Sequence, residues 1–392
     1  MSERNARAAD VVVIGGGVIG LAIAWRACAR GLRVTLLERG RAGGGTTRVA
    51  AGMIAPIAEV TPGEEPLLEL GLRSARAYPA FAREVAAAAG VAGISYTRCG
   101  TLLVARDGDE AEALERELEL RRRHGLAVER LRASEARRRE PALAPALRLA
   151  LDVPDDHAID PRALTAALAE AIRRAGGDLR ELTPAVSLEL AGGRVHGVVL
   201  DDGSTLRANQ VVIAAGVWSN QLGGVPAGAR VTVRPVKGQI MRLHDPAGPG
   251  LLTRVIRMGS SYVVPRGDGR YVIGATSEER GFDTSVTAGA AFELLRDAGE
   301  LVPGVSELEL DEFSAGLRPG TPDNLPVIGG DGPGSVDGLY WATGHRRGGI
   351  LLAPVTAELI VDALAGEDRP AHAVAFAPER FAHRVHRVGS PA

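Results

Sequence analysis

The residues Gly15-Gly16-Gly17-Val18-Ile19-Gly20 have the G-x-G-x-x-G spacing that binds the pyrophosphate of a dinucleotide. Gly15 permits a tight turn, Gly17 lets the backbone approach the pyrophosphate, and Gly20 lets a helix pack close to a strand. The N-terminus of such a helix supplies free N–H groups and a partial positive charge for the anion. The chemistry expected at this end of the chain is therefore the binding of a dinucleotide cofactor.

The elements around this glycine run are those that the motif requires. Residues 11–14 form a short β-branched run typical of a buried parallel strand, 18–30 predict a helix, and 33–37 predict a second strand. Glu38 follows that strand, 18 residues after Gly20, which suits a carboxylate that accepts a ribose hydroxyl. This carboxylate favours a free 2′-hydroxyl over a 2′-phosphate, and at this point both NAD and FAD remain candidates.

The segment after Glu38 favours a flavin. Residues 43–53 read Gly-Gly-Gly-Thr-Thr-Arg-Val-Ala-Ala-Gly-Met, in which small residues and two hydroxyls allow the backbone to run along a bulky flat ligand. Nicotinamide dehydrogenases need no such segment here, whereas flavoproteins need it to hold the pyrophosphate and the edge of the flavin ring. We therefore predict FAD as the cofactor.

The composition limits the class of protein. The 392 residues carry a formal net charge of -2, which argues against a nucleic-acid partner, and the length suggests two domains or one large composite. Only Cys28 and Cys99 are present, so neither a disulfide framework nor a cysteine-rich metal site is expected, and we find no ligand set for a metal. No uninterrupted apolar run reaches the ~18 residues that span a bilayer. We expect a cytoplasmic protein with no membrane partner that forms a homo-oligomer.

The rest of the chain alternates between helical and β patterns. Helices are predicted at 64–89, 108–123, 161–175, 288–301 and 349–364, a hairpin at 195–206, and strands at 210–214, 314–318 and 339–343. Residues 230–275 are mainly β, with turns expected at Gly238, Gly259 and 267–269. We therefore predict an α/β fold whose domains are discontinuous, with the chain crossing between them several times.

At this point the chain resembles the amine-oxidising flavoproteins, the family that includes D-amino-acid oxidase, sarcosine oxidase and glycine oxidase. The resembling stretches extend in family order over nearly the whole chain. They are residues 12–20, 46–53, 215–219 (Ala-Gly-Val-Trp-Ser), 234–239 (Arg-Pro-Val-Lys-Gly-Gln), 262–266, 274–276, 315–321 (Ala-Gly-Leu-Arg-Pro-Gly-Thr), 344–345 and 349–354.

The resemblance implies a Rossmann-like FAD-binding domain interleaved with an α+β substrate domain built on an antiparallel sheet. The FAD domain would comprise residues 1–85, 152–228 and 312–392, and the substrate domain 86–151 and 229–311. Sarcosine oxidase-like members hold the flavin through a C-terminal cysteine, which this chain lacks, so the FAD should be non-covalent. The positions implied for the cofactor are Gly15, Gly17, Val18, Ile19, Gly20, Glu38, Arg39, Thr46, Thr47, Ala51, Gly52, Met53, Ala185, His345, Arg346, Arg347, Gly348, Gly349, Ile350 and Leu351.

The resemblance also implies an amino-acid substrate. A buried carboxylate needs a fixed cation, which arginine supplies with its bidentate fork, and Arg318 matches the carboxylate-binding arginine of the family. Tyr262 matches a tyrosine whose hydroxyl contacts that carboxylate, and Arg347 matches a second arginine near the site. Ser260, Ser277 and Arg346 depart from the histidine, methionine and aromatic residue found in the family, which predicts a more polar or wider pocket.

The implied reaction is the oxidation of glycine, sarcosine or small D-amino acids to an oxo acid, ammonia and hydrogen peroxide, with glycine imine destined for the thiazole of thiamine. A D-amino-acid dehydrogenase that uses a quinone or dye acceptor is the alternative. We assign no catalytic acid or base, because positioning the Cα–H and the carboxylate suffices. For His345 we therefore prefer a helix-start role near the flavin over that of a base. Lys237 is either a positive charge near the flavin or a partly exposed strand residue.

Overall fold

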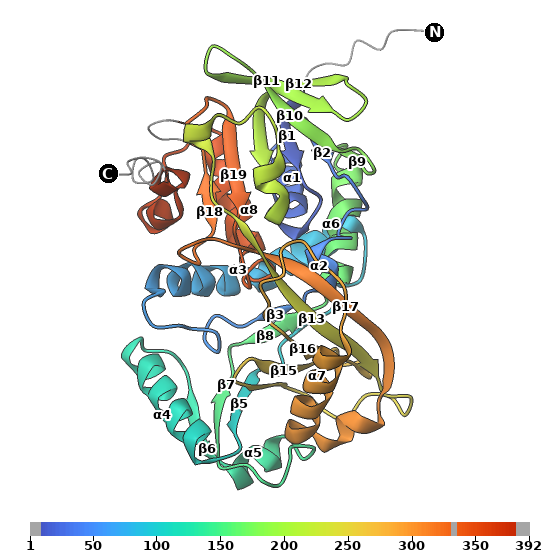
Figure 1. Cartoon of the computed structure of the whole chain (residues 1–392), viewed down its shortest axis with the longest axis vertical. Helices are drawn as coiled ribbons and strands as arrows, with labels where there is room; N and C mark the ends of the chain where they lie inside the picture. The colour runs from blue at the N-terminus through green and yellow to red at the C-terminus, as the bar shows by residue number, and fades with distance from the viewer. Residues whose placement is uncertain (1–8, 331–334, 382–392) are drawn as a thin grey trace, which may run out of the picture.

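Two eight-stranded sheets organise the molecule, one in the upper and one in the lower part of Figure 1. The structure is a computed structural model that describes residues 9–330 and 335–381. In the first sheet, β1 pairs in parallel with β2 and β12, and β12 pairs in parallel with β19. Its strands are β1 (Ala9–Ile14), β2 (Val34–Leu37), β9 (Asp178–Arg180), β10 (Ala185–Ala191), β11 (Arg194–Leu200), β12 (Thr205–Ile213), β18 (Val327–Gly329) and β19 (Leu339–Thr343).

Helices cover one face of the parallel part of this sheet, where β1 and β2 are buried along almost their whole length. The same core contains side chains of β1 and β2 and those of four helices, and α1 buries nearly its whole circumference. The antiparallel strands β10 and β11 lie with β12 over a second core. The four helices are α1 (Val18–Ala29), α3 (Glu65–Ala89), α6 (Pro161–Arg174) and α8 (Ala353–Leu364).

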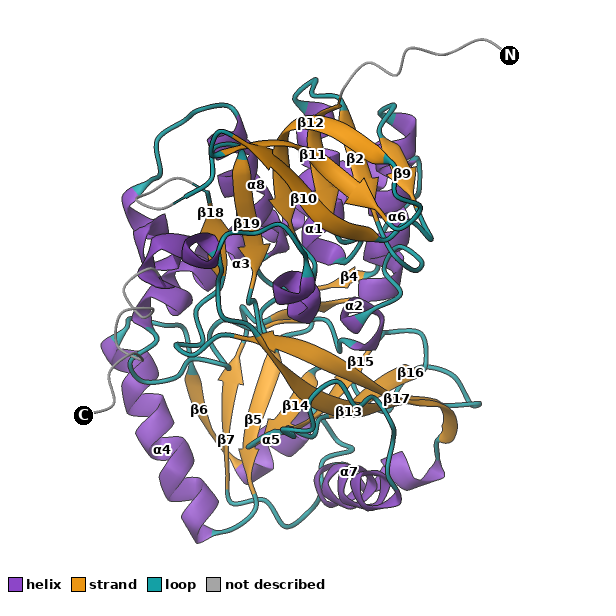
Figure 2. Cartoon of the chain, turned by 45° about the horizontal axis from the view of Figure 1, so that its top comes forward, coloured by secondary structure: helices purple, strands orange, loops and turns teal. Residues whose placement is uncertain are grey.

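The second sheet is antiparallel except for the parallel pair β14–β5. Its order is β17-β13-β16-β15-β14-β5-β7-β6, and Figure 2 shows these strands below the first sheet with α4 and α7 at the outside. The strands are β5 (Thr101–Ala105), β6 (Glu129–Arg132), β7 (Leu149–Val153), β13 (Arg234–His244), β14 (Val255–Met258), β15 (Ser261–Pro265), β16 (Arg270–Gly274) and β17 (Glu309–Gly320).

Short elements connect the two sheets. A three-stranded sheet with the order β3-β8-β4 lies between them. The remaining elements are β3 (Met53–Ile54), β4 (Tyr96–Thr97), β8 (His157–Ile159), α2 (Thr46–Val49), α4 (Gly108–Arg123), α5 (Ala133–Arg139), α7 (Ala288–Leu301) and the 3₁₀ turns η1 (Gly216–Gln221), η2 (Ala227–Ala229), η3 (Pro303–Glu307) and η4 (Ala371–Phe376).

The predicted α/β class with interleaved sheets is confirmed, whereas several local predictions are wrong. Gly238 lies inside β13 and forms no turn, and the last helix begins at Ala353 because residues 349–352 form separate turns before it. The strand predicted at 210–214 is the second half of the longer β12. The domain ranges stay a prediction, and β17 spans the boundary proposed at residue 312.

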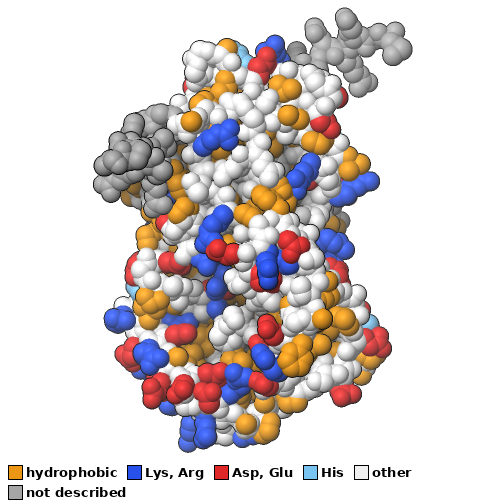
Figure 3. Space-filling view, in the orientation of Figure 1, with side chains coloured by type: hydrophobic (Ala, Val, Ile, Leu, Met, Phe, Trp, Pro, Cys, Tyr) orange, Lys and Arg blue, Asp and Glu red, His pale blue; other side chains and the backbone are white. Residues whose placement is uncertain are grey.

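The surface carries charges of both signs. On the face shown in Figure 3, Lys and Arg side chains are interspersed with Asp and Glu side chains. Within the described residues, no helix is long and apolar enough to cross a membrane.

The close contact between helix α1 and the turn after β1 gives a test of the fold. A Cβ added to Gly20 would lie 1.9 Å from the carbonyl oxygen of Gly15, so Gly20→Ala must push α1 away from β1. We expect this variant to lose most of its bound flavin and several degrees in Tm. The absorbance of flavin relative to protein in the purified variant, together with thermal unfolding, measures both effects.

Gly289→Ala is the matched control, because a Cβ at this helical position of α7 meets no atom within 4 Å. If Gly20→Ala retains a full complement of flavin, the close contact between α1 and β1 is not what holds the cofactor.

Candidate active site

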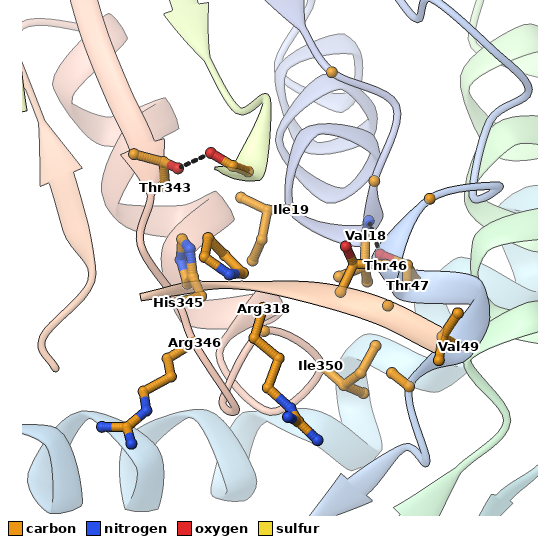
Figure 4. A pocket seen from close by; sticks show the side chains of 18 of the residues that line it. Val18, Ile19, Thr46, Thr47, Val49, Arg318, Thr343, His345, Arg346 and Ile350 are labelled. Carbon is orange, nitrogen blue, oxygen red and sulfur yellow. Dashed lines mark hydrogen bonds between the residues drawn. The ribbon is translucent and has the colours of Figure 1, made fainter. Parts of the chain in front are cut away.

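A cavity of about 560 Å³ opens between the two sheets. Its walls come from the β1–α1 turn, from α2 and the residues after it, from the second sheet and from the turns before α8. Pockets that bind small molecules and cofactors commonly have this size and lie between domains. Figure 4 shows Val18, Thr46 and Thr47 at one end, with Arg318 and Arg346 reaching from elements further along the cavity.

The glycine turn forms the nucleotide end. Gly15 has a φ of +112°, which a residue with a side chain rarely adopts, and Gly17 begins α1 without a side-chain cap. The Val18 N–H donates to Thr47 Oγ1 at 3.1 Å, and the Thr46 hydroxyl donates to the carbonyl of Leu317 at 2.8 Å. The first N–H groups of the helix after Val18 are therefore available to an anion in the cavity.

Glu38 lies at the end of β2 beside this turn. Its carboxylate accepts hydrogen bonds from the N–H of Gly16 at 2.7 Å and from the N–H of Gly40 at 2.8 Å. The guanidinium of Arg39 lies over the ring of Trp218, 3.8 Å from its centroid. These residues close the end of the cavity where the motif predicts a ribose.

The turns that precede α8 form the opposite wall, and helix α3 holds them. The Ser74 hydroxyl donates to the carbonyl of Leu351 at 2.6 Å, and the Tyr78 hydroxyl donates to the carbonyl of Ile350 at 3.0 Å. Because both acceptors are fixed by buried side chains, the peptide groups of this segment keep one orientation next to the cavity.

His345 lines the cavity in this wall and is buried. Burial lowers the pKa of its imidazole to about 3, and its Nε2 lies 3.0 Å from the hydroxyl of Thr356. The ring is therefore neutral at physiological pH and has a hydrogen-bond partner. It lies eight residues before α8, so its place is in a turn and not at the helix start.

Arg318 extends from β17 into the cavity (Figure 4). Its Nη1 donates to the carbonyl of Thr276 at 3.0 Å and to that of Lys237 at 3.4 Å. A Cβ added to Gly238 would lie 2.3 to 2.4 Å from the guanidinium, so glycine at this strand position makes room for the arginine. Among the described residues, no carboxylate lies within ion-pair distance of Arg318.

Tyr262 lines the cavity from strand β15 of the same sheet. Burial raises the pKa of its phenol, which keeps the hydroxyl protonated and able to donate. Arg347 Nη2 lies 3.3 Å from Glu59 Oε1, and Arg257 Nη1 lies 3.4 Å from the same oxygen. All four side chains line the cavity, so Glu59 and Arg257 belong to the site although the sequence analysis did not identify them.

Three departures from the family pattern also face the cavity: Ser260, Ser277 and Arg346. The backbone of Arg346 has a φ of +42°, which is unusual for a residue with a side chain, and its N–H donates to the carbonyl of Pro319 at 2.8 Å. This bond ties the turn before α8 to the end of the strand that carries Arg318.

The expectation that Lys237 is partly exposed is wrong, and a charge near the flavin stays a prediction that the cavity lining does not support. Its side chain is 1 % exposed, and its Nζ lies 2.7 Å from Asp283 and 3.9 Å from Glu278. Its neighbours Val236 and Gly238 line the cavity whereas Lys237 does not, because successive side chains of a strand point to opposite faces. The lysine is a buried ion-pair partner that lies on the face of β13 turned away from the cavity.

The structure brings most of the predicted positions to one cavity. Gly20, Gly348 and Leu351 do not line it, which agrees with a packing role for Gly20. The predicted residues that do line it are Gly15, Gly17, Val18, Ile19, Glu38, Arg39, Thr46, Thr47, Ala51, Gly52, Met53, Ala185, Tyr262, Arg318, His345, Arg346, Arg347, Gly349 and Ile350.

A sequence model described as FAD dependent oxidoreductase matches residues 10–363. The chain belongs to this family of FAD-dependent oxidoreductases. It is 37% identical to a glycine oxidase of Geobacillus kaustophilus over 97% of this chain and 98% of that protein. The crystal structure of glycine oxidase from the same organism superposes with a TM-score of 0.88 over 95% of this chain and 98% of that one, at 35% identity.

The chain is also similar to one part of a longer, bifunctional protein. The chain is 35% identical to the bifunctional protein ThiO/ThiG of Synechocystis over 95% of its own length, and it covers 54% of that protein. This chain therefore corresponds to about half of the bifunctional relative.

The cavity fits the FAD that this family uses. The glycine turn at its nucleotide end has no side chain that would block a pyrophosphate, and α1 begins there without a cap. Ala185 and Trp218 line the cavity from the first-sheet side and Tyr262 lines it from the second sheet, so one cavity is open to both parts of the molecule. The oxidoreductase assignment and the FAD cofactor agree with the prediction from the sequence.

The burial of His345 predicts a pH dependence of stability. Its folded pKa of about 3 lies below the usual value of 6.5 for histidine, so between these pH values the unfolded chain takes up a proton that the folded chain does not. This contribution to stability is complete above pH 6.5 and decreases as the pH falls toward 3. The free energy of unfolding of the wild type should fall between pH 7 and pH 5, with about 2 kcal/mol of that fall due to His345. We expect this part to be absent in His345→Gln, which keeps a hydrogen-bonding side chain.

Denaturant unfolding of the wild type and the variant at both pH values measures this difference. Equal pH dependence in the two proteins would show that folding does not lower the pKa of His345.

Proposed function

We propose that this protein oxidises glycine and other small amines, such as sarcosine and small D-amino acids, with non-covalent FAD and molecular oxygen. The observation that carries the proposal is the guanidinium of Arg318, which reaches into the cavity with backbone carbonyls as its partners. A cation in this position is suited to a substrate carboxylate. For glycine the overall reaction consumes water and oxygen and yields glyoxylate, ammonia and hydrogen peroxide.

In this proposal the side chains bind and orient the substrate. Arg318 holds the carboxylate, the protonated hydroxyl of Tyr262 donates a hydrogen bond to it, and Arg347 adds positive charge nearby. When bound, FAD supplies the two-electron oxidant that accepts the hydride of the substrate Cα. His345 has no role as a base, because burial lowers the pKa of its imidazole to about 3 and its Nε2 is bonded to Thr356.

The cofactor would be held without a covalent bond. Neither Cys28 nor Cys99 lines the cavity, and Cys28 lies on α1. The likeness to a bifunctional ThiO/ThiG protein supports a role in supplying glycine imine for the thiazole of thiamine. A cytoplasmic location and a homo-oligomeric state complete the proposal.

An oxygen-electrode assay with glycine, sarcosine, D-alanine and D-proline tests the activity. Oxygen consumption with equimolar peroxide supports the oxidase. Turnover that requires an added dye or quinone would instead establish the dehydrogenase alternative. Purified protein without flavin absorbance, and without flavin released on denaturation, would contradict both.

The fork of Arg318 gives the sharpest prediction for substrate binding. We expect Arg318→Lys to raise the KM for glycine about 100-fold, because an ammonium cannot replace two parallel N–H donors to a buried carboxylate. The flavin content should not change, since the side chain of Arg318 is bonded to the carbonyls of Lys237 and Thr276 and not to the glycine turn. Steady-state kinetics and the flavin spectrum measure the two properties separately.

Arg73→Lys is the control, because Arg73 is exposed on α3 and pairs with Glu69. Unchanged kinetics in Arg318→Lys would remove this residue from the substrate site.

A further inference from the structure

The segment between β3 and α3 is fixed by two buried side chains. Asp156 accepts hydrogen bonds from the N–H of Ile57 at 3.2 Å and the N–H of Ala58 at 2.6 Å. Arg121 Nε donates to the carbonyl of Ile57 at 3.0 Å, and its Nη2 donates to that of Ala58 at 3.0 Å. Both side chains are 0% exposed. All four polar groups of these two residues are therefore bound, and the segment has one conformation.

Glu59 follows directly and lines the cavity. Its Oε1 lies 3.4 Å from Arg257 Nη1 and 3.3 Å from Arg347 Nη2, so two guanidinium groups share one oxygen. Arg257 Nη1 also donates to the carbonyl of Ala58 at 3.1 Å, which ties this arginine to the same fixed segment. The segment that carries Glu59 is thus held from outside the cavity, whereas its carboxylate is held by two arginines that line the cavity.

The sheet register places this cluster beside the proposed substrate site. Arg257 on β14 lies directly opposite Tyr262 on β15, so their side chains share one face of the sheet. The charges of Glu59, Arg257, Arg318 and Arg347 all act on the phenol of Tyr262, which places that hydroxyl among them.

The charges at this end of the cavity are unbalanced. Four arginines line it, Arg257, Arg318, Arg346 and Arg347, and Glu59 is the only acid among the described lining residues apart from Glu38 at the nucleotide end. Without Glu59, the two guanidinium groups beside Tyr262 would be free to bind a carboxylate. With Glu59 in place, they already share one.

We propose that Glu59 determines specificity by occupying the position that a second acid group of a substrate would take. An amino acid with one carboxylate binds through Arg318. A substrate with another carboxylate on its nitrogen substituent finds Arg257 and Arg347 already paired with Glu59 and has to approach that like-charged carboxylate. Asp156 and Arg121 are positioning residues, because they hold the segment that carries Glu59 and do not line the cavity. The inference rests on the proposed amine oxidation and specifies its substrate class.

Iminodiacetate and its monoamide, N-(carbamoylmethyl)glycine, form a matched pair of substrates. Both are secondary amines of nearly equal shape, and only the diacid has the second charge. We expect the wild-type holoenzyme to have a kcat/KM for the monoamide at least tenfold above that for the diacid. Glu59→Gln, which keeps the size of the side chain, should lower this preference at least tenfold.

Two further variants complete the experiment. Glu69→Gln, the same substitution on an exposed acid of α3, should leave the preference at its wild-type value. Asp156→Asn should lower the preference in the same direction as Glu59→Gln, because it weakens the hydrogen bonds that hold the segment. A purely structural role for Glu59 would change kcat/KM for both substrates alike.

The outcomes separate this inference from the proposed function. A wild-type enzyme that prefers the diacid, or a Glu59→Gln variant with an unchanged preference, would overturn the role of Glu59 while leaving the oxidase in place. Absence of turnover with glycine, sarcosine and the monoamide, in a preparation with full flavin content, would contradict the proposed function itself.

Discussion

The central constraint on this structure is that a guanidinium inside the protein must be held without being neutralised. Arg318 meets it by donating to the carbonyls of Thr276 and Lys237, which fix its position and leave its charge available. The arrangement requires that Gly238 has no side chain, since a Cβ there would occupy the volume of the guanidinium. A strand pair with glycine on one side and arginine on the other is thus the basis of the proposed substrate site.

Hydrogen bonds connect the strand that carries Arg318 to segments that pack with the first sheet. The hydroxyl of Thr46 reaches the carbonyl of Leu317, next to Arg318, and the N–H of Arg346 reaches the carbonyl of Pro319 on its other side. The strand β17 is therefore anchored at two points by segments that also line the nucleotide end or the wall before α8. The glycine turn is linked to the same strand through Thr47, which accepts from Val18, and its neighbour Thr46, which donates to Leu317.

Much of this could be predicted from the sequence because it depends on local order along the chain. The β1–α1–β2 unit and the helices at 108–123 and 288–301 follow from periodicity and from caps within a few residues. The faces of strands depend on register with distant segments, which periodicity does not specify. Gly238 was therefore mistaken for a turn, and Lys237 was expected near the flavin or at the surface.

The residues Glu59 and Arg257 could not be found from sequence for the same reason. They are 198 positions apart, and their side chains meet only because β14 packs against the fixed segment after β3. The family resemblance located residues within recognisable motifs, such as Arg318 and Tyr262. It gave no indication of a carboxylate whose position depends on Asp156 and Arg121, because neither belongs to a motif.

The order in which the chain builds its two sheets has a consequence for dividing the protein. Along the described residues, strands of the first sheet are followed by β5 to β7, then β9 to β12, then β13 to β17 and finally β18 and β19, so the chain changes sheet four times. No single cut separates the nucleotide-binding half from the half that carries Arg318. Each half is made of several separate stretches of the chain. Exchanging one half between relatives would therefore require rejoining the backbone at several places at once.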